Sequence, residues 1–174
     1  MKIHKLSSDF KNQVQKVILL VFVLVLAVLF SQKLVLANSV TYEVDFVKSN
    51  QFVRGPYPEG RVEQSESSVL VKYEPVYFSI YSPRHFKQAK VTIRYKKTAD
   101  LKSQLGLKLN LNKWAFFFED LPETGDQFIE YELIFDLANA EYFKNNIKFI
   151  IAAPGIDSHK GVIEIDRIKF DLLK

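Results

Sequence analysis

The chain has 174 residues, enough for one domain and a targeting segment, and it contains no cysteine. Disulfides, thiolate metal sites and cysteine nucleophiles are therefore excluded. The formal net charge of +4 belongs to the first 37 residues, where five lysines face one acidic residue, so the rest of the chain is neutral and has no bulk attraction for nucleic acid.

The N-terminal segment combines a basic start with an apolar stretch. Lys2, Lys5, Lys11 and Lys16 precede residues 17–30, which carry no polar side chain. As a helix these 14 residues span about 21 Å, less than the roughly 30 Å hydrocarbon core of a bilayer. A basic region followed by a short apolar region is typical of a secretory signal peptide.

Two interpretations of residues 1–37 remain open. Val35 and Ala37 occupy the −3 and −1 positions of a signal-peptide cleavage before Asn38. Alternatively, the helix continues through Ala37, Lys33 extends its ammonium group toward water, and residues 17–37 form a permanent membrane anchor. Both interpretations place residues 38–174 outside the cytoplasm, with membrane contact only through residues 17–37.

After Asn38 the apolar side chains recur at every second residue, which predicts strands rather than helices. The Gly/Pro-rich range 54–60 predicts a loop, 61–68 an exposed connection, and 139–146 one or two helical turns. The predicted strands are 40–46, 69–73, 76–81, 91–96, 105–111, 114–118, 128–136, 147–153 and 163–172.

The last predicted strand changes phase. Ile163 and Ile165 point one way, and Ile168 and Phe170 point the same way only if the alternation slips by one residue. A β-bulge near Asp166 produces such a slip.

About nine short strands with frequent turn signals predict an all-β fold, a jelly-roll-like β-sandwich, preceded by an N-terminal hydrophobic signal or anchor helix. The domains are therefore 1–37, signal peptide or membrane anchor, and 38–174, an exported sandwich.

No catalytic motif stands out in this sequence. Neither GxSxG nor HExxH occurs, and only His85 and His159 follow the leader. We assign no catalytic residue and expect binding rather than catalysis.

Three acidic residues form a candidate calcium site. Glu43 and Asp45 leave the same face of the first strand, and Asp166 lies at the predicted bulge of the last. First and last strands often pair in a sandwich, and calcium takes carboxylate and carbonyl oxygens. The alternative is that these acids belong to the exposed faces of edge strands.

Aromatic side chains are the candidate ligand contacts, because flat rings stack on the apolar C–H faces of sugars. In the range 114–118, Trp114 shares one face with Phe116 and Phe118, while Phe117 lies on the other. If Phe117 points inward, the Trp114 face is exposed; the alternative is that both faces are covered. The candidates are Trp114, Tyr57, Tyr81, Tyr95 and Tyr73.

The C-terminal pattern carries a resemblance. The run 149–155, followed by the run 163–168 with Asp166 between apolar residues, resembles the last two strands of carbohydrate-binding-module-like, galactose-binding-like jelly-roll domains. The first-strand acid Glu43 is similar to their frequent structural calcium ligand. The resemblance implies a binding module for a carbohydrate.

These observations predict an exported, non-catalytic β-sandwich that binds a glycan or cell-envelope polymer. The alternative is a membrane-tethered structural or interaction subunit that docks against a neighbouring envelope protein. A hydrolase would need a pocket that joins His85 or His159 to a carboxylate.

Overall fold

The computed structural model describes residues 3–36, 38–44, 46, 48, 50–98, 100–125, 127–157 and 161–174. The chain divides into two compact units, Met1–Ala37 and Asn38–Lys174.

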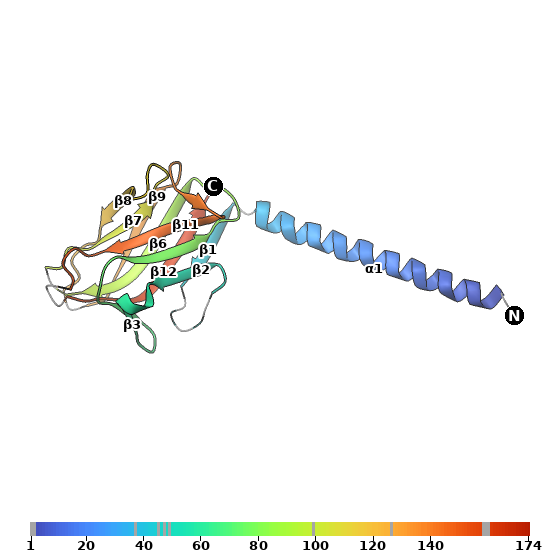
Figure 1. Cartoon of the computed structure of the whole chain (residues 1–174), viewed down its shortest axis with the longest axis horizontal. Coiled ribbons are helices and arrows are strands. Elements are labelled where there is room, and N and C mark those ends of the chain that lie inside the picture. The colour runs from blue at the N-terminus through green and yellow to red at the C-terminus, as the bar shows by residue number, and fades with distance from the viewer. Residues whose placement is uncertain are drawn as a thin grey trace. The chain divides into compact units, whose positions relative to one another are not determined.

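The first unit is one helix, α1 (Ile3–Leu36), drawn in blue in Figure 1. Its stretch Asn12–Phe30 contains no buried residue and is long and apolar enough to cross a membrane, a criterion that a signal sequence also meets.

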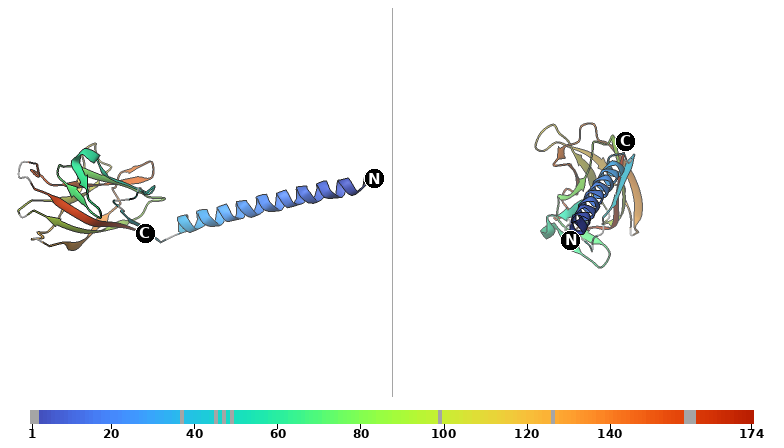
Figure 2. Two further views of the ribbon diagram at one scale, coloured as in Figure 1. Left: turned by 90° about the horizontal axis from the view of Figure 1, so that it is seen from below. Right: turned by 90° about the vertical axis from the view of Figure 1, so that its right-hand side faces the viewer.

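The second unit contains two six-stranded antiparallel sheets. In sheet A the order is β3, β4, β12, β6, β9, and β1 also pairs with β12. The early strand β1 therefore lies beside the last strand of the chain (Figures 1 and 2). The bounds in sheet A are β1 (Ser39–Glu43), β3 (Val62–Gln64), β4 (Val69–Val71), β6 (Gln88–Lys97), β9 (Ile129–Asp136) and β12 (Ile163–Leu173).

In sheet B the order is β2, β5, β11, β7, β8, and β10 pairs with β11. A short 3₁₀ helix, η1 (Glu59–Arg61), follows β2. The bounds in sheet B are β2 (Val53–Tyr57), β5 (Val76–Tyr81), β7 (Gln104–Lys108), β8 (Phe116–Asp120), β10 (Tyr142–Phe143) and β11 (Asn146–Ala152).

The core lies between the two sheets and is rich in phenylalanine. Phe170 of β12 contacts Phe78 and Phe149 of sheet B, with ring centroids 6.1 and 5.0 Å apart. Phe135 of β9 meets Phe149 edge-on at 5.6 Å. These rings are fully buried, so the inner faces interdigitate as expected for a sandwich.

The predicted all-β sandwich is confirmed. The predicted bulge is also confirmed, because the register between β12 and β6 shifts between Ile165 and Arg167. This shift lets Ile165 and Ile168 both face the core.

Three local predictions were wrong. Part of the predicted loop 54–60 is strand β2; as an edge strand it tolerates Pro56 where its register with β5 shifts. Part of the predicted connection 61–68 is strand β3, which pairs with β4. The range 139–146 forms a hairpin rather than helical turns, because Lys144 and Asn145 have φ of 49° and 59°, as a tight two-residue hairpin turn requires.

Candidate functional site

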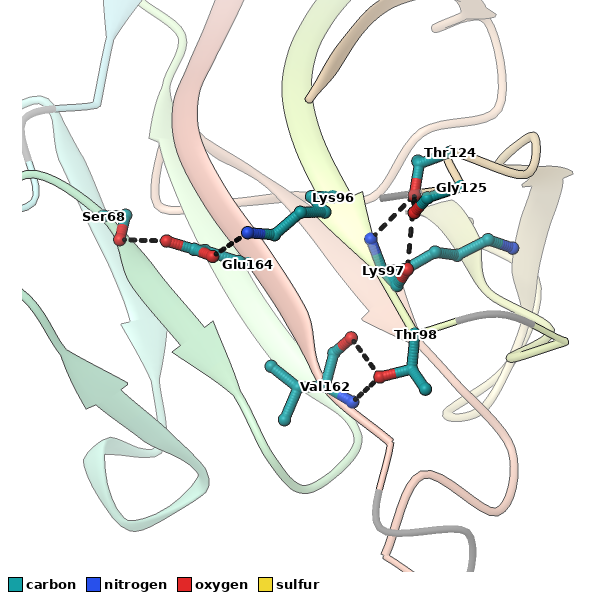
Figure 3. A network of polar contacts seen from close by, with 8 residues as sticks. All are labelled: Ser68, Lys96, Lys97, Thr98, Thr124, Gly125, Val162 and Glu164. Carbon is teal, nitrogen blue, oxygen red and sulfur yellow. Dashed lines mark hydrogen bonds and ion pairs between the residues drawn. The ribbon is translucent and has the colours of Figure 1, made fainter. Parts of the chain in front are cut away.

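The outer face of sheet A is covered by ion pairs between neighbouring strands. Glu164 illustrates the pattern: it accepts hydrogen bonds from Lys96 at 2.9 Å and from Ser68 at 3.0 Å (Figure 3). Further pairs on this face are Arg94–Asp166 at 2.5 Å and Lys90–Glu132 at 3.1 Å. Most of the charge on this face is therefore satisfied within the domain.

The outer face of sheet B instead carries a row of three aromatic residues, an isoleucine and a glycine. The register places Tyr57 beside Tyr77, Tyr77 beside Ile150, Ile150 beside Gly106, and Gly106 beside Phe118. We call these five residues the aromatic row. It crosses the strands from β2 at one edge of the sheet to β8 at the other.

Gly106 allows the row to be continuous. A Cβ atom at this position would lie 2.7 Å from both Ile150 and Phe118, so the absence of a side chain leaves room for both to lie over β7. As a result, Ile150 is only 5% exposed although it is on the outer face, whereas Phe118 is 37% exposed.

At the other end of the row, the rings of Tyr57 and Tyr77 stack with centroids 5.5 Å apart and planes 28° apart. Burial raises the pKa of the Tyr57 hydroxyl, Tyr77 raises it further and Arg54 opposes the shift. Tyr57 therefore remains a neutral hydroxyl that can both donate and accept a hydrogen bond at neutral pH.

A groove of about 690 Å³ lies beside this tyrosine pair. Its lining brings together the loop after β1, strand β2, and outer-face residues of β5, β10 and β11. The lining residues include Tyr57, Arg54, Ser79, Lys148, Phe143 and Glu59. The groove therefore combines aromatic surface with hydrogen-bonding and charged groups, as ligand sites usually do.

Trp114 precedes β8 and lies in the loop 109–115 rather than in a strand. Its side chain is 73% exposed. Phe117 points toward the inner face, where it meets buried Phe135 edge-on at 6.2 Å. Phe116 and Phe118 consequently share the outer face, 5.8 Å apart, as the alternation predicts.

The other predicted aromatic contacts are dispersed. Tyr81 shares the outer face of β5 but packs against Phe52 at 5.9 Å and does not line the groove. Tyr73 is exposed in the turn between β4 and β5. Tyr95 is fully buried, and its hydroxyl donates a hydrogen bond to the carbonyl of Pro122 at 2.7 Å, so it belongs to the core.

The predicted calcium ligands are engaged in part by arginines. Glu43 lies 3.8 Å from Arg167, and one oxygen of Asp166 lies 2.5 Å from Arg94. The other Asp166 oxygen is buried and has no hydrogen-bond partner among the described residues. Asp45 lies outside the described residues. Within the residues that are described, no three acids, histidines or cysteines gather closely enough to hold a metal ion. The calcium site thus remains a prediction that depends on Asp45.

Four residues of this face were not among the candidates proposed from the sequence: Tyr77, Phe118, Arg54 and Lys148. A signal for Tyr77 was present, because strict alternation in the range 76–81 places it opposite the buried Phe78. Arg54 was overlooked because the range 54–60 was predicted to be a loop rather than a strand. Lys148 was overlooked because the other residues of the range 147–153 are apolar and predicted a strand that is covered on both faces.

No protein-family model and no curated protein matches this sequence. Among solved structures, it is similar to a family 29 carbohydrate-binding module from Piromyces equi, with 12% identity, a TM-score of 0.53, and coverage of 78% of this chain and 92% of that chain. It is also similar to the CBM22-1 xylan-binding domain from Paenibacillus barcinonensis, with 9% identity, a TM-score of 0.50, and coverage of 76% and 94%. The resemblance expected from the sequence is confirmed: residues 38–174 share the β-sandwich fold of carbohydrate-binding modules.

Proposed function

We propose that residues 38–174 are an exported, non-catalytic module that binds a carbohydrate or a cell-envelope polymer, and that the aromatic row is its binding surface. The fold shared with carbohydrate-binding modules supports this proposal. The apolar stretch of α1 supports delivery across a membrane.

The aromatic row is the observation that carries the proposal. Five strands side by side separate their outermost members by about 19 Å, at about 4.8 Å per strand. Tyr57 and Tyr77 lie at one end of this span and Phe118 at the other. A polysaccharide laid across the strands would place the apolar faces of separate sugars on separate rings.

Trp114 extends the proposed surface into the loop that connects β7 to β8. Its loop follows β7, and Phe116 lies at the start of β8, between this loop and Phe118. We therefore keep Trp114 as a proposed ligand contact, together with Tyr57, and we remove buried Tyr95 from the proposed surface.

Glycan-array binding by the full chain, in a detergent without a sugar headgroup, tests the proposal. Tyr77→Ala and Phe118→Ala should each weaken the observed binding roughly tenfold, because each removes one stacking ring. Tyr73→Ala removes an exposed ring outside the row and serves as the matched control. Near-ultraviolet circular dichroism verifies that each variant is folded.

Two results would count against the proposal. Glycan binding that survives both row variants would place the site elsewhere. Complete absence of glycan binding, with crosslinking of the same face to a neighbouring envelope protein, would favour the interaction subunit.

The predicted calcium ion is tested by measuring the melting temperature in calcium and in a chelator. A ligand that binds the native state raises the melting temperature.

A further inference from the structure

A second row on sheet B brings two cations together beside the tyrosine pair. Arg54 lies beside Ser79, and Ser79 lies beside Lys148, in the register of β2, β5 and β11. The three residues alternate with buried Val53, Ile80 and Phe149, so they share the outer face. A guanidinium and an ammonium group therefore flank one hydroxyl at the groove.

Arg54 and Lys148 are absent from the ion pairs formed by the described residues. Glu59 is the one acidic residue among the described residues that line the groove. Arg54 and Lys148 thus outnumber the acidic groups of the described lining, whereas the formal charges of residues 38–174 balance.

The cations on the outer face of sheet A differ from Arg54 and Lys148 in their ion pairing. There, Arg94, Lys96 and Lys90 each have a carboxylate partner on a neighbouring strand. Both faces are solvent-exposed surfaces of the same sandwich, so a general shortage of acidic residues does not explain the difference. An external anion would supply the missing counter-charge in the groove.

The cations also lie next to the proposed sugar platform. The Lys148 ammonium is 5.7 Å from the centre of the Tyr77 ring. Arg54 is close enough to act electrostatically on the Tyr57 hydroxyl. A sugar stacked on these tyrosines would present its substituents to both cations.

We infer that the carbohydrate bound by this face is acidic, a polysaccharide that carries carboxylate or phosphate groups, and that Arg54 and Lys148 are the residues that select it. This inference rests on the proposed carbohydrate-binding function. Arg54 offers a planar pair of donors that suits either anion, and Lys148 offers a compact positive charge. The Ser79 hydroxyl beside them would donate a hydrogen bond to the same anion.

The test compares three polymers on the full chain in sugar-free detergent: polygalacturonate for carboxylate, phosphomannan for phosphate, and neutral xylan. Arg54→Gln and Lys148→Gln should each weaken binding of the preferred acidic polymer roughly tenfold, because a charge-assisted hydrogen bond is lost. Both variants should weaken binding of xylan, which carries no acidic group, less than binding of the acidic polymer. Lys87→Gln removes an exposed cation outside the groove and is the control.

Salt dependence of the unaltered chain provides an independent measurement that does not rely on folding of a variant. Affinity for the acidic polymer should fall between about 0.05 M and about 0.5 M salt, because ions screen the contact. Preference for polygalacturonate would identify carboxylate as the selected group, and preference for phosphomannan would identify phosphate.

Equal affinity for xylan and the acidic polymers, insensitive to salt and to Arg54→Gln, would overturn the inference and leave the proposed function intact. Loss of all polymer binding in Tyr77→Ala, with no effect of either cation variant, would have the same meaning. Failure of the unaltered chain to bind any of the polymers or any array glycan would instead contradict the proposed function.

Discussion

Glu164 shows what the paired charges of sheet A contribute at the scale of one residue. The hydrogen bond from Lys96 lowers the pKa of this carboxyl below its usual 4.5, burial opposes the shift, and Ser68 adds to it (Figure 3). Because the pKa is lower in the folded state, the stabilisation is complete above the unfolded pKa and is lost as the pH falls through the folded pKa.

Replacing Glu164 with Gln should therefore reduce the loss of stability in acid. We expect the free energy of unfolding to depend less steeply on pH below about 4.5 than in the unaltered chain. Urea unfolding at a series of pH values, followed by near-ultraviolet circular dichroism, measures this slope. Ser68→Ala removes only one of the two donors and should change the slope less; an unchanged slope in Glu164→Gln would contradict the assignment.

At the scale of an element, Lys108 connects the end of β7 to the loop that carries Trp114. Its side chain is only 6% exposed, and its ammonium donates hydrogen bonds to the carbonyls of Asn112 at 2.6 Å and Leu109 at 3.1 Å. It also lies 3.2 Å from Glu141. A buried ammonium group needs such partners, and here they fix the path of the loop.

Lys108→Met keeps most of the side-chain stem but removes these donors, and it should destabilise the domain by about 1–3 kcal/mol. Trp114 is the single tryptophan of the chain, so its fluorescence anisotropy reports the order of this loop directly and should fall. Lys102→Met, at an exposed position before β7, is the control. Unchanged anisotropy and stability in Lys108→Met would show that the loop holds its shape without the ammonium group.

At the scale of the whole molecule, the sandwich has a core of its own. The buried cluster of the second unit runs from Tyr42 to Leu172. Packing among these residues therefore supplies the second unit with its own hydrophobic core.

We expect residues 38–174 on the far side of the cytoplasmic membrane, because lysines precede the apolar stretch. Intact-mass measurement after separation of membrane and soluble fractions checks this. A species that begins at Asn38 would show cleavage, and a full-length species in the membrane would show an anchor. A full-length species in the cytosolic fraction would contradict export.

The sequence by itself determined the class of the fold. Period-two alternation showed which side chains lie on opposite faces of each strand, and its slip near Asp166 located the bulge. The same alternation groups Tyr95 with buried Val91 and Ile93, so its place in the core was also accessible. These properties are local, because they depend on the geometry of one strand.

Only the tertiary structure decided which residues form the candidate site. Tyr57 and Phe118 belong to one row because β5, β11 and β7 lie between their strands, an order that alternation within a strand does not contain. Arg54 and Lys148 both lie beside Ser79 for the same reason. Alternation separates the two faces of a strand, but strand order and the packing of one sheet on the other decide which outer faces become neighbours.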